Sequence, residues 1–556
     1  MTDLNKHNSK KLKIWLPLLF SLVLVLGMLI GINLKQTPVV ASKEKIPIIR
    51  TIEPGRVEEL LRYVEAKYVD DINRDELTEK AIGNLLNELD PHSNYISAKQ
   101  LKEVNEQLEG NFEGIGIEFM ILDDTILVVT PIVGGPSEAA GILAGDRIIE
   151  IEDSIVTGQD IVVKDVVGML RGNKGTDVKI GIHRRNVDEI KYFTITRDKI
   201  PINSVDIGYM LDEKTGYIRI SRFSATTYRE FMEKIEDLVD NYQMEDLVID
   251  LRQNPGGYLQ EATNILSQLF SEKGNLLVYT EGRTVKRNDY KSTGKPFYNI
   301  GNIAVLIDEG SASASEIIAG AIQDWDRGVI IGRRSFGKGL VQEQYSLKDG
   351  GALRLTIARY YTPSGRSIQK SYEDLDAYSH DVYDRRKNGE LYNADSISIA
   401  DTTKYFTLKE NRVVYGGGGI QPDIFIPLDT MYINDYYLAL RKELPNYIFR
   451  LVEDNKRDFN YNLVEFKSLY SVTDNALNKF LSYSETQGIE KRKVKHMKDF
   501  RKTLKLSFKT YVARQLFGDE GFYVIKNEKD PSVLQALESL KQQPDSVTSE
   551  KAELNE

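Results

Sequence analysis

The longest almost wholly apolar segment of the chain covers residues 14–32, close to the N-terminus. A helix that spans a membrane needs about 20 such residues. Positive flanks stay in the cytoplasm, and the segment is preceded by Lys6, Lys10, Lys11 and Lys13. The pattern therefore predicts a cytoplasmic tip and transmembrane anchor at residues 1–34, with the rest of the chain in the periplasm or outside the cell. The alternative is a signal peptide cleaved at Val39-Val40-Ala41, although the apolar run is long for one.

Helical periodicity follows a polar linker at residues 35–52. Apolar residues at positions 57, 60, 61, 64 and 68 share one helical face, and a second such pattern runs from about residue 75 to residue 89. The turn Asp90-Pro-His-Ser93 ends the second helix. We predict an N-terminal helical region at residues 53–107, in which the lone His92 has a surface or capping role.

Short strands and glycine-rich turns replace the helical pattern at residues 108–188. The succession resembles a PDZ domain, with a glycine-rich loop at Gly114, Ile115, Gly116 and Ile117. Consecutive backbone N–H groups of such a loop can converge on the C-terminal carboxylate of a peptide. We therefore predict that these four residues bind a peptide carboxylate. An ordinary small β-domain is the alternative.

Strands and helices alternate at residues 189–429, which predicts a layered α/β core. The polar segment 374–403 within it is expected to be an exposed insertion. Residues 430–540 are charged, rich in tyrosine and lysine, and predicted to be helical, and the polar tail 541–556 is predicted to be disordered. The predicted fold class is multidomain α/β: a transmembrane helix, a helical segment, a PDZ-like β-domain inserted before the α/β core, and a helical C-terminal region.

Composition narrows the chemistry that this architecture can carry. The chain has 556 residues, enough for about three or four domains. Its formal net charge of -10 argues against a general nucleic-acid binder. The absence of cysteine excludes a catalytic cysteine, a disulfide framework and a zinc site with cysteine ligands.

Small hydroxyl residues gather between a predicted buried strand at 302–308 and a predicted helix at 317–322, in Gly310-Ser-Ala-Ser-Ala-Ser-Glu316. The N-terminus of a helix offers free N–H groups and a positive dipole end, which suit an oxyanion. We predict that Ser313 is a nucleophile, although spacing alone does not separate it from Ser311 or Ser315. Each of these serines could instead cap the helix.

The base for such a serine is predicted to be Lys338, in Ser335-Phe-Gly-Lys-Gly339. No histidine lies in the serine or lysine motif. A lysine can act as a base when burial without a carboxylate partner lowers its pKa. Positions 338, 340 and 342 share a face of a strand, so the amide of Gln342 could aim the amine. The alternative is a surface lysine in a turn.

A second turn of the core ends the predicted strand 246–252 at Gly256 and Gly257. Glycines allow close approach of the backbone. An N–H group of this turn could therefore pair with that of Ala314 as an oxyanion hole, although a plain turn is the alternative.

Together these motifs resemble the carboxyl-terminal processing peptidases, or tail-specific proteases, from about residue 55 to residue 427. The resemblance rests on Asp90-Pro-His-Ser93, the PDZ segment, Asp250-Leu-Arg-Gln-Asn-Pro-Gly-Gly257, Gly310–Glu316, Gln323-Asp324, Ser335–Gly339 with Gln342, and Gly418-Gly-Ile-Gln-Pro-Asp423. It implies that Ser313 is the nucleophile, Lys338 the general base and Gln342 its orienter. It also implies oxyanion donors at Ala314 and at Gly256 or Gly257. Asp324 matches a position to which the family sometimes gives a supporting role, and we expect it to be structural.

The resulting prediction is a membrane-anchored serine endopeptidase without metal or other cofactor. Its expected partners are polypeptides with exposed C-terminal tails and the membrane, with room for an activator or adaptor protein and no role for nucleic acid. One rival is a non-catalytic, membrane-anchored PDZ scaffold with a protease-like domain. Another is a hydrolase of small amides or esters.

Overall fold

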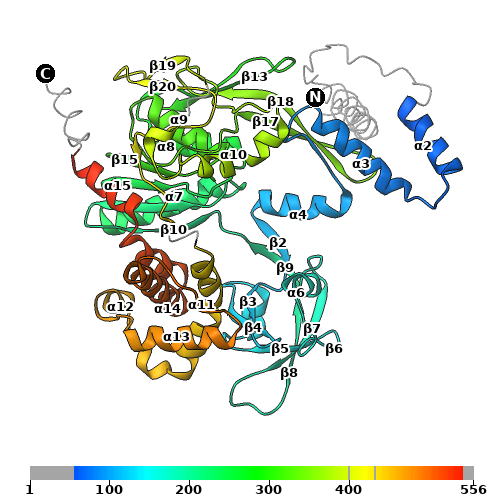
Figure 1. Cartoon of the computed structure of the whole chain (residues 1–556), viewed down its shortest axis with the longest axis vertical. Coiled ribbons are helices and arrows are strands. Elements are labelled where there is room, and N and C mark those ends of the chain that lie inside the picture. The colour runs from blue at the N-terminus through cyan, green and yellow to red at the C-terminus, as the bar shows by residue number, and fades with distance from the viewer. Residues whose placement is uncertain (1–54, 398–400, 431–433, 543–556) are drawn as a thin grey trace, which may run out of the picture. The chain divides into compact units, whose positions relative to one another are not determined.

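The computed structural model describes residues 55–397, 401–430 and 434–542 (Figure 1). The predicted anchor and the linker at 35–52 lie outside these residues, as does the predicted disordered tail beyond Gln542. No helix in the described part of the chain is long and apolar enough to span a membrane. The chain divides into two units, the first ending at Thr78 and the second beginning at Glu79.

The first unit holds α2 (Arg56–Lys67) and the beginning of α3 (Arg74–Asn87). Arg74 joins them by ion pairs to Glu58 and Glu65. On the predicted apolar face of α2 only Leu61 is buried, whereas the side chain of Leu60 is 63% exposed.

The second unit is built around a six-stranded sheet with the order β10-β11-β12-β15-β16-β21. All neighbouring strands are parallel except β10 and β11. The elements of this layer are β10 (Val205–Met210), β11 (Thr215–Ile220), α7 (Thr227–Tyr242), β12 (Asp246–Asp250), α8 (Leu259–Leu269), β15 (Ile303–Ile307), α9 (Ala314–Asp324), β16 (Val329–Gly332) and β21 (Ile424–Phe425).

Both faces of this central sheet are covered, because alternate side chains of a strand point to opposite faces. Ile249 and Val305 face the layer of α7, α8 and α9. Val248 and Leu306 face the other way and pack with α15 (Pro531–Gln542), which lies beside β15 in Figure 1. The predicted C-terminal helical region therefore contributes its last helix to the α/β core. Parallel strands buried on both faces present their loops at one common edge, where sites of α/β folds form.

A second sheet has the order β1-β18-β13-β14, and β17 also pairs with β18. Its strands are β1 (Asn94–Ile96), β13 (Lys273–Glu281), β14 (Asn288–Thr293), β17 (Leu340–Ser346) and β18 (Ala352–Tyr361). Strand β1 comes from the region predicted to be helical, and it pairs with β18 more than 250 residues later in the chain. A three-residue strand is too short to show a period in sequence.

The segment predicted as a PDZ domain forms a sheet of its own, ordered β3-β4-β5-β7-β8 with β6 beside β5. Its elements are β3 (Ile117–Ile121), β4 (Ile126–Pro131), α5 (Pro136–Ala140), β5 (Arg147–Ile151), β6 (Ser154–Ile155), α6 (Val163–Leu170), β7 (Asp177–His183) and β8 (Lys191–Thr196). Helix α4 (Ala98–Glu109) precedes it, and the antiparallel pair β2 (Asn111–Gly114) and β9 (Asp198–Pro201) flanks it.

The remaining elements belong to the polar insertion and to the C-terminal region. The insertion carries α10 (Leu375–Lys387), the 3-10 helix η1 (Ala394–Ser396), β19 (Lys404–Phe406) and β20 (Val413–Tyr415). The C-terminal region holds α11 (Asp435–Asp454), η3 (Lys456–Phe459), α12 (Leu463–Leu469), α13 (Asp474–Thr486) and α14 (Met497–Asn527) around an aromatic core that includes Phe480 and Phe508.

Candidate active site

The serine-rich turn joins the end of β15 to the start of α9, as the pattern predicts. Ser313 immediately precedes the helix with φ 56° and ψ −112°. A positive φ is uncommon for a residue other than glycine and stores strain. A sharp strand-to-helix turn also exposes the nucleophilic serine of α/β-hydrolases.

The three serines of the turn have different surroundings. Ser311 and Ser315 are buried, whereas Ser313 is partly exposed. The Ser311 hydroxyl donates to the Leu251 carbonyl at 2.8 Å, and the Ser315 hydroxyl donates to the Asn254 carbonyl at 3.0 Å. Two of the serines therefore fasten the turn to the chain that follows β12.

The Gly256–Gly257 turn lies directly against the serine turn. A Cβ placed at Gly256 would lie 2.7 Å from the Cβ of Ser313 and 2.9 Å from the Ala314 nitrogen, so only glycine permits this approach. The Gly256 N–H donates to the side-chain oxygen of Asn254 at 2.8 Å. In the described part of the chain, the N–H groups of Ala314 and Gly257 donate to no other protein atom.

The amine of Lys338 meets the predicted partner. Its Nζ donates to Oε1 of Gln342 at 3.1 Å. Burial, and then the positive charge of Arg354, hold the pKa of Lys338 below its usual value, against the opposing charges of Glu316 and Asp90. The argument from a shared strand face was wrong, because β17 begins at Leu340 and Lys338 lies in the loop before it.

His92, for which a surface or capping role was predicted, is half-buried. Its backbone carbonyl accepts a hydrogen bond from the side-chain amide of Gln342, and its ring Nε2 lies 2.6 Å from the Tyr378 hydroxyl. Burial, and then the charge of Lys338, lower the pKa of His92 to about 4, so its ring is neutral near pH 7. The Asp90 carboxylate accepts the N–H groups of His92 and Ser93 and fixes the turn. The motif Asp90-Pro-His-Ser93 predicts the turn. The role of the His92 carbonyl could not be predicted, because every residue has a backbone carbonyl.

The polar insertion also takes part, although we expected it to be exposed. Tyr378 and Arg385 of α10 are buried. The guanidinium of Arg385 donates to the carbonyls of Arg334 and Ser335, which lie just before Lys338. The polar composition of the insertion did not indicate this contact. Arginine and tyrosine side chains occur both at the surface and in buried hydrogen bonds to backbone carbonyls.

The predicted carboxylate loop lies between β2 and β3, in a different sheet from the serine and lysine segments. Gly116 has φ 74°, which favours glycine. The Ile115 carbonyl accepts both the N–H and the hydroxyl of Ser137, at 3.0 and 2.6 Å. Strand β3, which follows the loop, stands at the end of its sheet order.

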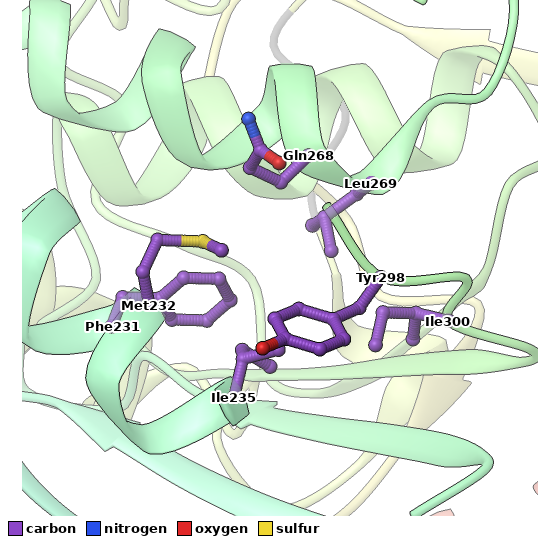
Figure 2. Close-up of a pocket in the computed structure, with 7 residues that line it drawn as sticks. All are labelled: Phe231, Met232, Ile235, Gln268, Leu269, Tyr298 and Ile300. Atoms are coloured by element: carbon purple, nitrogen blue, oxygen red, sulfur yellow. The ribbon is translucent and has the colours of Figure 1, made fainter. Parts of the chain in front are cut away.

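A small pocket lies away from these residues, between α7, α8 and the chain before β15 (Figure 2). It is lined by Phe231, Met232, Ile235, Gln268, Leu269, Tyr298 and Ile300. None of these is a predicted site residue, and the walls are mostly apolar. Among the described residues, no group of three or more histidine, aspartate or glutamate side chains is placed to hold a metal ion.

Comparison with known proteins gives the family. Residues 214–376 match the model of peptidase family S41, and residues 436–518 match a family of unknown function (DUF8443). A carboxy-terminal-processing protease of Bartonella bacilliformis is 35% identical over 404 residues, which cover 71% of this chain and 90% of that protein. The chain belongs to the carboxy-terminal processing proteases. The protease CtpB of Bacillus subtilis, with the same description, is 34% identical over 353 residues, covering 62% of this chain and 72% of its own.

This carboxy-terminal processing protease is therefore a serine-type peptidase. The segment that matches family S41 contains every predicted catalytic and oxyanion residue, whereas the predicted carboxylate loop precedes it. A solved structure of the photosystem II D1 C-terminal processing protease is 30% identical, covers 56% of this chain and 84% of its own, and has a TM-score of 0.32.

Proposed function

We propose that this carboxy-terminal processing protease is an endopeptidase with a Ser–Lys dyad, which captures the C-terminal tail of its substrate through a PDZ domain. Ser313 is favoured as the nucleophile because it is the partly exposed serine of the turn, and because the hydroxyls of Ser311 and Ser315 already donate to carbonyls. Lys338 is favoured as the base because its amine is half-buried and donates to a neutral amide.

The reaction then follows from proton positions. The neutral amine of Lys338 takes the hydroxyl proton as the Ser313 oxygen attacks the scissile carbonyl carbon. The resulting oxyanion accepts the N–H groups of Ala314 and Gly257. Gly257 is preferred to Gly256 because the Gly256 N–H already donates to Asn254.

The second half returns the enzyme to its starting state. The tetrahedral intermediate collapses, the carbon–nitrogen bond breaks, and the Lys338 ammonium gives its proton to the leaving amine. Water then attacks the acyl-enzyme, with the neutral Lys338 amine taking its proton, and releases the new C-terminal carboxylate and the Ser313 hydroxyl.

The loop Gly114–Ile117 is proposed to hold the substrate's terminal carboxylate through its backbone N–H groups. Edge strand β3 is available to pair with the extended tail. We further propose that the apolar segment 14–32 anchors the enzyme in the cytoplasmic membrane with its catalytic part outside. Cell fractionation with protease protection tests that location.

The observation that carries the dyad is the hydrogen bond from the Lys338 amine to the uncharged amide of Gln342. Its test compares Ser313→Ala with the matched variants Ser311→Ala and Ser315→Ala on a polypeptide with a free C-terminal tail. Ser313→Ala is expected to lose all turnover, and each control is expected to keep activity if it folds. Turnover by Ser313→Ala would exclude Ser313 as the nucleophile.

Tail recognition is tested with the same polypeptide carrying an amidated C-terminus. The expected result is a higher KM for the amidated copy, because it lacks the carboxylate charge. Equal cleavage of the two copies would exclude recognition through the carboxylate.

A further inference from the structure

One buried carboxylate joins the two proposed catalytic residues. Glu316 lies in the first turn of α9 and is fully buried. Its Oε2 accepts the N–H of Ser313 at 2.7 Å and the N–H of Lys338 at 2.9 Å. Its Oε1 accepts the N–H of Gly337 at 2.7 Å and the hydroxyl of Ser335 at 2.6 Å. The carboxylate therefore connects the serine turn to the loop that carries the lysine.

A buried phenol connects the same two residues through their other backbone groups. Tyr360 lies on β18 and is 1% exposed. Its hydroxyl lies 3.1 Å from the carbonyl oxygen of Ser313 and 2.7 Å from that of Lys338. The N–H and the C=O of each proposed catalytic residue thus contact the same two side chains, one from a helix and one from the second sheet.

We propose that Glu316 and Tyr360 are positioning residues that set the separation and orientation of Ser313 and Lys338. This inference rests on the proposed Ser–Lys function. Glu316 accepts from the backbone N–H groups of both residues, and Tyr360 contacts their backbone carbonyls. Neither the serine turn nor the lysine loop can therefore shift or rotate without breaking a buried hydrogen bond, which is costly. The same contacts hold Ser313 in its strained conformation, as surrounding structure must for such a residue.

The electrostatic environment of Glu316 supports a role beyond packing. A buried carboxylate without a cation partner is expensive, and among the described residues no lysine or arginine side chain forms an ion pair with Glu316. Burial raises the pKa of Glu316 to about 7 even though four donors oppose the rise. Its negative charge raises the pKa of Lys338, as does that of Asp90, whereas burial and Arg354 lower it. Removal of the Glu316 charge should therefore lower the pKa of Lys338.

The test measures kcat, KM and pH profiles for Glu316→Gln and Tyr360→Phe. We expect Glu316→Gln to lose about 10²-fold in kcat with little change in KM, because small misplacement of reacting groups acts on the transition state. The limb of its pH profile on which activity rises with pH should move to lower pH. Tyr360→Phe should lose about 10-fold in kcat with that limb unmoved, because it removes no charge.

Tyr217→Phe is the matched control. Tyr217 is also a fully buried tyrosine of the α/β core, but its hydroxyl donates to Asp250 at 2.7 Å. We expect this control to lose thermal stability and to keep its kcat. If Glu316→Gln does not fold, the comparison of kcat between Tyr360→Phe and Tyr217→Phe tests the positioning role.

Three outcomes overturn the inference: folded variants with wild-type kcat, a loss in Tyr360→Phe equal to that in Tyr217→Phe, or an unmoved limb in a folded Glu316→Gln. The proposed function fails separately, if Ser313→Ala keeps turnover. An inactive Ser313→Ala beside fully active Glu316→Gln and Tyr360→Phe would reject only the positioning role.

Discussion

The segments proposed to do the chemistry and the domain proposed to read the tail are held by contacts of different kinds. Ser313 and Lys338 are fixed by buried hydrogen bonds to the side chains of Glu316 and Tyr360. The PDZ-like domain meets helix α11 through one buried ring, Phe449, which packs in a small apolar cluster with residues 122 and 127.

Ion pairs also join the PDZ-like domain to the C-terminal helices. They include Arg450–Asp123, Arg185–Glu453, Arg185–Asp454 and Arg514–Glu118, and the arginine side chain of each pair is exposed. A buried polar group left without its partner costs about 1–3 kcal/mol, whereas an exposed ion pair contributes about 0–1 kcal/mol. The contacts that hold the proposed dyad are therefore the stronger ones, and those that join the PDZ-like domain to the C-terminal helices are the weaker ones. Changes near the dyad should act on kcat, and changes in the PDZ-like domain should act on KM.

Among the variants that compare the two regions, the largest effect is expected from Gln342→Glu. A carboxylate beside Lys338 stabilises the ammonium form and raises its pKa, so the activity limb should move to higher pH. Because general-base catalysis contributes about 10²–10⁴-fold, kcat near neutral pH should fall by about 10²-fold. Steady-state kinetics across pH measure both effects.

Gln487→Glu is the matched control, since the same change of charge falls at an exposed position at the end of α13, outside the α/β core. It should leave the limb near its wild-type position. An unmoved limb in Gln342→Glu would contradict the contact between Gln342 and the base.

A smaller effect, on KM, is expected from Gly116→Ala. The added Cβ would meet the Ile200 side chain at 2.9 Å in a backbone conformation with φ 74°, so the carboxylate loop must deform. Disturbance of one charged recognition contact predicts about a 10-fold rise in KM for the free-tailed substrate, which corresponds to about 1.4 kcal/mol, with kcat unchanged. The amidated substrate should show no such rise.

Gly158→Ala controls for the backbone cost, because Gly158 has φ 68° and open space around its Cβ direction. Should Gly116→Ala reduce kcat with KM unchanged, the division between the two regions would be wrong.

The smallest effect is expected at the ion pair of Arg450 and Asp123, whose side chains are 38% and 61% exposed. A double-mutant cycle with Arg450→Ala and Asp123→Ala, followed by chemical unfolding, should give a coupling energy below about 1 kcal/mol. A coupling of several kcal/mol would show that the domain is held as firmly as the dyad.

Much of the layered core could be predicted from apolar runs and helical spacing. Strands were expected at 246–252 and 302–308 and a helix at 317–322, where the structure has β12, β15 and α9. The order of the strands and the pairing of β1 with β18 could not be predicted, because such pairings depend on contacts between distant segments.

The proposed catalytic residues could be predicted from the sequence, but the residues that hold them in place could not. Spacing left three serines equivalent, because the positive φ of Ser313 depends on contacts made by other elements. The role of the His92 carbonyl could not be predicted either, because it is a backbone group that every residue has. Glu316 stood within the quoted serine motif, and its contacts with Lys338 and Gly337 become evident only when the two segments meet in space.

The most direct measurement of the central claim is covalent labelling with a fluorophosphonate, with the modified residue mapped by mass spectrometry. We expect a single adduct at Ser313, which should form faster as pH rises through the pKa of Lys338. In Lys338→Ala the labelling rate should fall by about 10³-fold or more, because the serine loses its base. An adduct at Ser311 or Ser315, or a wild-type labelling rate in Lys338→Ala, would contradict the proposed Ser–Lys dyad.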